Sequence, residues 1–78
     1  MQIEEIMQEP LSELRKLLKK HNFSIEPDQI HGWRVKYTYP NGPDEFFGPT
    51  REFTLPHFMR SENERVAILY TLRRFVNN

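Results

Sequence analysis

The stretch Trp33-Arg34-Val35-Lys36-Tyr37-Thr38-Tyr39 decides the fold of this 78-residue chain. In residues 33–39, aromatic or β-branched side chains alternate with polar ones. Because successive side chains of a strand point to opposite faces of a sheet, the alternation predicts a half-buried strand. The face expected to be buried carries Trp33, Val35, Tyr37 and Tyr39. The open face carries Arg34, Lys36 and Thr38.

Two further strands are expected beside this one. Phe23 and Ile25 alternate with polar neighbours, and Pro27 limits that segment to a short or edge strand because proline has no N–H to give to a sheet. Residues 40–44, Pro-Asn-Gly-Pro-Asp, have the chemistry of a turn. A third strand is therefore expected within residues 46–55, with regular pairing from about position 50.

Helices are expected before and after the strands. Leucines at positions 11, 14, 17 and 18 follow Pro10 at helical spacing, and the helix that they predict should end near residues 21–22. A second helix is expected from Ser61, because Ser61-Glu62-Asn63-Glu64 has the pattern of a capping box with Ser61 as the N-cap. Its expected buried stripe comprises Val66, Ile68, Leu69, Leu72, Phe75 and Val76.

Together these elements predict an α+β domain. The expected architecture is a two-layer sandwich in the order α-β-β-β-α, with an antiparallel three-stranded sheet and both helices on one face. Residues 1–10 are expected to form a short amphipathic extension, with Ile3, Ile6 and Met7 at helical spacing, and residues 11–78 a single domain. The predicted core comprises Leu14, Leu18, Trp33, Val35, Tyr37, Leu69 and Leu72.

Length and composition exclude several classes of protein. A chain of 78 residues holds at most one core, which excludes Rossmann, TIM-barrel and two-domain enzyme architectures. Without cysteine there is no disulfide or thiolate zinc site, and assembly into a homodimer is one way to add stability. The three histidines lie far apart in sequence and no glycine run is present, so we expect no metal and no cofactor. Short apolar runs and an acidic start predict a cytoplasmic protein without a membrane partner.

Charge is segregated along the chain although the 11 basic and 11 acidic residues cancel. Residues 1–14 hold four glutamates and no basic residue, whereas residues 15–36 hold six basic residues against two acidic ones. A pI near 6.8 is not typical of a protein that binds nucleic acid mainly through counterion release. Residues 15–36 are compatible with a local basic face for RNA; an ordinary mixed solvated surface is the alternative.

Several segments resemble the HicA-type toxins, over almost the whole chain apart from its first ten residues. Leu11–His21 is similar to the opening helix of that family, Asn22–Phe23 to its turn into the first strand, and Gly32 to the glycine before its second strand. Residues 53–57, Phe-Thr-Leu-Pro-His, resemble the family's strand followed by Pro-His. Thr71–Phe75 resembles its closing helix.

The resemblance implies an αβββα fold like that of double-stranded-RNA-binding domains, an action on RNA, and silencing by a HicB-like antitoxin. The catalytic histidine of HicA toxins normally stands two residues after the glycine that Gly32 matches, and that position here is Arg34. Because an arginine cannot shuttle a proton near neutrality, we expect RNA binding rather than cleavage. A cleaving protein would be a metal-independent ribonuclease with His31 as its general acid/base. The alternative is that His31 is a solvated loop residue.

Cations are the expected contacts to RNA. Arg34 and Lys36 lie on the open face of the central strand, and Lys19 and Lys20 lie late in the first helix. His57 is added by the HicA resemblance alone. Binding at these residues should be weak and sensitive to salt, since the chain as a whole is neutral.

A second function, from a different class, remains open. The chain has the size of a non-catalytic inhibitor or adaptor of the kind that phages and mobile elements carry. The acidic stretch at residues 1–14 would suit docking on the basic surface of a nucleoprotein. RNA with a HicB-like antitoxin, and a protein or nucleoprotein target, are therefore the two alternatives for the partner.

Overall fold

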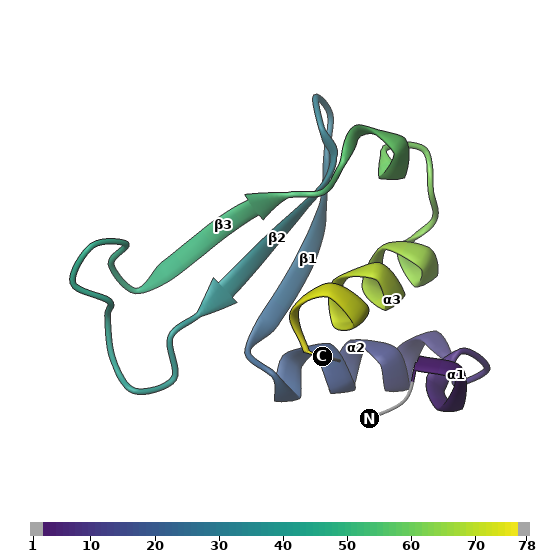
Figure 1. Cartoon of the computed structure of the whole chain (residues 1–78), viewed down its shortest axis with the longest axis horizontal. Helices are drawn as coiled ribbons and strands as arrows, with labels where there is room; N and C mark the ends of the chain where they lie inside the picture. The colour runs from purple at the N-terminus through teal and green to yellow at the C-terminus, as the bar shows by residue number, and fades with distance from the viewer. Residues whose placement is uncertain (1–2, 77–78) are drawn as a thin grey trace.

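The computed structural model describes residues 3–76 and has the predicted order of elements (Figure 1). The sheet comprises β1 (Phe23–Asp28), β2 (Gly32–Thr38) and β3 (Thr50–Thr54), all antiparallel in the order β1-β2-β3. The helical elements are α1 (Ile3–Ile6), α2 (Leu11–Lys20), the 3₁₀ turn η1 (His57–Met59) and α3 (Glu64–Phe75). The α+β prediction is confirmed. None of the helices described here is long and apolar enough to cross a membrane.

Pairing in the sheet follows from the alternating pattern of β2. Val35 lies opposite Ile25 on one side and Phe53 on the other. The strand containing Pro27 is an edge strand, as predicted, and β3 begins at Thr50, where regular pairing was expected. The loop between β2 and β3 projects away from the helices (Figure 1).

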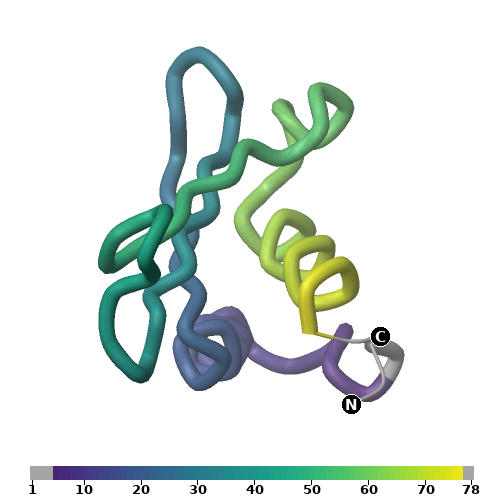
Figure 2. The backbone as a smooth tube through the Cα atoms, turned by 60° about the vertical axis from the view of Figure 1, so that its left-hand side comes forward, coloured from purple at the N-terminus to yellow at the C-terminus, as the bar shows by residue number. Residues whose placement is uncertain are grey.

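The two longer helices, α2 and α3, lie on the same side of the sheet (Figures 1 and 2). Two adjoining clusters of buried side chains form the core beneath them. One cluster joins the helices through Leu14, Leu18, Ile68 and Leu72. The other joins α3 to the sheet through Val35, Leu55, Met59 and Ala67.

The aromatic side chains predicted for the core are only partly buried. Val35 is fully buried, but Trp33 and Tyr37 are half-buried because they lie towards the two ends of β2. The indole Nε1 of Trp33 donates a hydrogen bond of 2.8 Å to the carbonyl oxygen of Glu62, which holds the ring at the rim of the core. On α3, Leu69 is half-buried, and Ile68 takes the fully buried position.

The predicted N-cap of the last helix was wrong by two residues. α3 begins at Glu64, and the side-chain oxygen of Asn63 accepts from the backbone N–H of Val66 at 2.9 Å. The chain is still turning before that point, because the N–H of Glu62 donates to the carbonyl of Met59. Ser61 therefore lies in the turn rather than at the helix start.

The N-terminal extension is fastened to α3. Ile6 packs against the helical cluster, while the side chain of Ile3 lies outside the described part of the chain. A guanidinium nitrogen of Arg65 donates to the carbonyl oxygen of Glu9 at 2.6 Å and to that of Met7 at 3.3 Å. Residues 5–10 thus close the end of the helical layer.

Gly32 allows the turn between β1 and β2 to lie against the segment before α3. Its φ is +83°, and a Cβ atom placed there would come within 2.5 Å of the Arg60 Cα. A side chain at this position would therefore strain the backbone and clash with a second backbone segment.

Leu72→Ala should cost about 3 kcal/mol of unfolding free energy, because Leu72 is fully buried between the helices. Leu69→Ala should cost about 1 kcal/mol, because Leu69 is only half-buried. Urea melts of both variants measure the difference. Equal losses would contradict this placement of the α3 face.

Asn63→Ala should cost about 1 kcal/mol through loss of the cap on α3. Ser61→Ala should change stability by less than about 0.5 kcal/mol, because Ser61 is exposed and caps nothing in the described residues. Thermal melts of the two variants test the corrected helix start. A larger loss from Ser61→Ala would restore the capping-box assignment.

Candidate functional site

The open face of the sheet holds Arg34 as predicted, but among carboxylates. Its guanidinium nitrogens lie 3.5 Å from Glu26, 3.7 Å from Asp28 and 3.8 Å from Glu52. Three negative charges surround one positive charge, and the Arg34 side chain is 39% exposed. A phosphate approaching Arg34 would meet these carboxylates first, so this position is a poor anion site.

His31 lies at the same end of the sheet, bound to one of these carboxylates. Its Nδ1 is 3.5 Å from an oxygen of Asp28, and that oxygen also accepts from the backbone N–H groups of His31 and Ile30. Donation from the His31 N–H, followed by that from Ile30, lowers the pKa of Asp28. Asp28 thus brings His31 and Arg34 together, but in an acidic setting.

The other predicted RNA contacts are spread over the molecule. Lys36 lies on the open sheet face, level with Ser24 and Glu52. His57 opens the 3₁₀ turn η1, near the start of β2, whereas Lys19 and Lys20 close α2 near the other end of the sheet. These five predicted residues, Arg34 included, therefore do not form one surface.

A groove at the far end of the sheet gathers a different set of residues. It has a volume of about 620 Å³, and its lining comes from the ends of α2 and α3, the start of β1, and the neighbouring ends of β2 and β3. We call it the aromatic–basic groove. It is lined by Lys20, His21, Asn22, Phe23, Tyr37, Tyr39, Arg51, Phe53, Phe75 and Val76.

Five aromatic rings run in series through this groove. Neighbouring ring centroids are 5.1 Å apart from Tyr39 to Tyr37, 5.0 Å from Tyr37 to Phe23, 5.5 Å from Phe23 to Phe75, and 5.1 Å from Phe75 to Phe53. These are the spacings of favourable aromatic pairs. Each ring is only half-buried, so the row combines a fixed arrangement with accessible ring surface.

Cations flank the rings. The Arg51 guanidinium carbon lies 4.2 Å from the Phe47 ring centroid and 4.9 Å from that of Phe53, which holds the charge beside the ring row. Lys20 is exposed at the end of α2. None of the described residues that line the groove is acidic. The groove therefore offers flat apolar surface together with positive charge that is not offset within its lining.

Sequence reasoning found only part of this site. Lys20 was predicted as an RNA contact, and Tyr37 and Tyr39 were predicted to face inwards, but Arg51 was not singled out. The missing signal is the β2–β3 register, which places Arg51 directly opposite Tyr37. A single strand's alternation does not contain that pairing.

Asp28→Asn should lower the free energy of unfolding at neutral pH. It should also make that free energy fall less steeply as the pH is lowered. Because folding lowers the pKa of Asp28, the ionised carboxylate stabilises the folded state above the unfolded-state pKa of about 4, and this contribution disappears as pH falls through the lower folded-state pKa. Urea melts between pH 7 and pH 2 measure the effect. Glu45→Gln, at an exposed loop residue, is the control. Parallel pH curves for wild type and Asp28→Asn would contradict the assignment.

Two features of the described chain are thus candidates for function. One is the acidic cluster around Arg34 and His31, and the other is the aromatic–basic groove. In residues 3–76, no three acidic or histidine side chains are grouped so that they could hold a metal ion. Comparisons of this sequence and structure with protein-family models, curated proteins and solved structures find no match.

Proposed function

We propose that this protein is an RNA-binding module that holds single-stranded RNA in the aromatic–basic groove. The observation that carries the proposal is the row of five half-buried rings flanked by Lys20 and Arg51, without an acidic residue in the lining. Single-stranded RNA presents unstacked bases beside regularly spaced phosphates. Rings beside cations are the complementary arrangement.

In this proposal the two kinds of side chain have separate tasks. Tyr39, at the accessible end of the ring row, stacks on a base, because every base has a flat π face. Lys20 and Arg51 contact the adjoining phosphates. With a net charge of zero and only two fully charged cations in the lining, binding should be weak and sensitive to salt.

Binding without cleavage is the favoured form of the HicA-like function. His31 lies beside Asp28 at the opposite end of the sheet from the groove, and the position of the HicA catalytic histidine holds Arg34. Cytoplasmic messenger RNA is the ligand that the HicA resemblance implies. A HicB-like antitoxin is the protein partner that it implies.

A protein-binding inhibitor or adaptor is the second candidate. It is favoured by apolar side chains that face solvent, with Phe46 85% exposed and Ile30 and Phe58 each 70% exposed. Large exposed apolar side chains on a small domain are typical of protein contacts when they form one patch. Phe46 belongs to the β2–β3 loop, which lies away from the β1–β2 turn and η1 that hold Ile30 and Phe58 (Figure 1), so the three do not form one patch and the groove is the stronger candidate.

RNA binding should depend on the groove and not on the open sheet face. With a fluorescein-labelled single-stranded RNA of ten nucleotides, Tyr39→Ala should weaken binding at least about fivefold, through loss of one stacking contact. Lys20→Ala and Arg51→Ala should each reduce the slope of log Kd against log salt by about 0.7, the effect of one lost phosphate contact on a single strand. Fluorescence anisotropy between 50 and 200 mM NaCl measures both quantities.

Matched controls distinguish the groove from other basic positions. Lys16→Ala removes an exposed cation of α2, and Lys36→Ala removes one from the open sheet face. Neither should change affinity or salt slope. Loss of binding with Lys36→Ala alone would move the RNA site to the open face. No affinity even at low salt, with all variants folded by circular dichroism, would end the RNA proposal and leave the protein-binding candidate.

A further inference from the structure

Within residues 3–76, no strand pairs with the outer edge of β1, which carries a regular pattern of backbone groups. The N–H of Thr38 donates to the carbonyl of Asn22, and in an antiparallel ladder such bonded pairs recur at every second residue. The backbone N–H and C=O groups of Ser24 and Glu26 therefore bond to β2. The N–H and C=O groups of Phe23 and Ile25 point the other way, towards the free edge.

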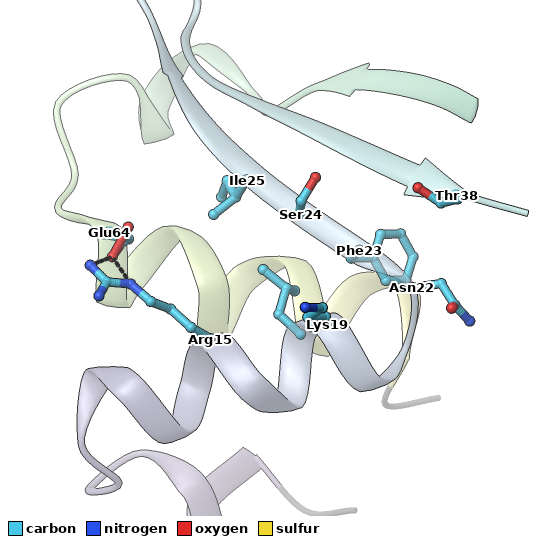
Figure 3. Close-up of a pocket in the computed structure, with 9 residues that line it drawn as sticks. Arg15, Lys19, Asn22, Phe23, Ser24, Ile25, Thr38 and Glu64 are labelled. Atoms are coloured by element: carbon cyan, nitrogen blue, oxygen red, sulfur yellow. Dashed lines mark hydrogen bonds and ion pairs between the residues drawn. The ribbon is translucent and has the colours of Figure 1, made fainter. Parts of the chain in front are cut away.

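A second groove runs along this edge, between β1 and α2 (Figure 3). Its volume is about 530 Å³. It contacts both sides of the strand, since Ser24 belongs to the open face and Ile25 to the face that packs on the helices. Its lining comprises Arg15, Leu18, Lys19, Asn22, Phe23, Ser24, Ile25, Thr38 and Glu64. We call it the β1-edge groove.

Apolar side chains form one part of the β1-edge groove and cations another. Leu18, Phe23 and Ile25 supply the apolar surface. Arg15 is bonded to Glu64 through its Nε at 2.8 Å, whereas no carboxylate of the described residues lies within ion-pair distance of Lys19 (Figure 3). Lys19 is exposed, so its charge is available to a ligand in the groove.

We propose that an extended, acidic segment of a partner protein binds in the β1-edge groove as a fourth strand of the sheet. Its backbone pairs with the free N–H and C=O groups of Phe23 and Ile25, which is a common mode of peptide recognition. One apolar side chain of the segment lies against Leu18 and Ile25. A side-chain carboxylate two residues along the segment, which lies on the same side of the strand, meets Lys19.

Pro27 sets the length of the bound segment. It lacks an N–H, and its position in the alternation directs that missing group towards the free edge. Pairing with the partner segment therefore ends before Pro27. About four residues of the partner segment lie opposite β1. The site is thus suited to a short linear segment rather than to a long strand. The β1-edge groove shares Asn22 and Phe23 with the aromatic–basic groove, but the proposed RNA contacts Lys20, Tyr39 and Arg51 do not line it.

Amide hydrogen exchange provides the direct test, with the synthetic peptide acetyl-TETVTET-amide as the probe, because its valine and both glutamates lie on the same side of an extended strand. At saturating peptide, exchange of the Phe23 and Ile25 amides should slow at least about threefold, because these N–H groups become hydrogen-bonded. The amides of Ser24 and Glu26, already bonded to β2, should not change. NMR measures all four amides in the same titration of the full chain.

Charge variants test the role of Lys19. Lys19→Glu should weaken peptide binding about fivefold, whereas Lys16→Glu, an exposed lysine of the same helix outside the groove, should change it less than twofold. The peptide acetyl-TKTVTKT-amide, with lysines in place of the two glutamates, should bind at least about fivefold more weakly than the acidic one. Both lysines are exposed, so neither variant removes a core contact.

Several outcomes would overturn the proposal. One is the absence of any change at Phe23 and Ile25 up to millimolar peptide. Another is equal binding of the acidic and basic peptides. A dimer of the free protein in sedimentation, with Phe23 and Ile25 protected from exchange, would identify a second copy as the occupant. Protection of Ile25 by RNA alone would identify a nucleic-acid surface, because Ile25 lines the β1-edge groove and not the aromatic–basic groove. The variants Tyr39→Ala and Arg51→Ala should retain peptide binding, so failure here and failure of RNA binding are distinguishable.

Discussion

The packing of α3 between α2 and the sheet is the contact on which the rest of the molecule depends. Ile68 and Leu72 face α2, while Ala67 joins the cluster around Val35. A methyl group at position 67 lets the helix approach the sheet closely. The buried side chain of Thr71 is polar but satisfied within the helix, because its hydroxyl donates to the carbonyl of Ala67 at 2.8 Å. In so small a domain, one helix serves both parts of the core.

This arrangement also separates the charged groups. The helices cover one sheet face but leave the ends of β2 and β3 overhanging, and the basic last turns of α2 and α3 lie beside that overhang (Figure 1). At the opposite end, the tight β1–β2 connection collects Asp28, His31 and Arg34. The sheet therefore has an acidic end and an aromatic, basic end although the whole chain is neutral.

Periodicity within single elements predicted most of the fold. Alternation in residues 33–39 predicts which way Arg34 points, and helical spacing predicts the contacts of Leu14 and Leu18. These patterns do not contain the register between strands. That register places Glu26 and Glu52 beside Arg34, and it places Arg51 opposite Tyr37. The start of the last helix was misplaced because Ser61 and Asn63 are both good capping residues. The turn before α3, which the local pattern does not show, leaves Asn63 as the cap.

The two connections of the sheet differ in how they would accept a chemical label. At the β1–β2 turn, a Cβ on Gly32 would meet the backbone of Arg60, and Asp28 holds the N–H groups of Ile30 and His31. Around Gly42, in the β2–β3 loop, nothing would lie within 4 Å of an added Cβ. A fluorophore or tether attached at the neighbouring exposed Asn41 would thus leave the packed layers intact. The long loop is therefore a suitable site for immobilising the domain with the β1-edge groove open, because no residue of this loop lines that groove.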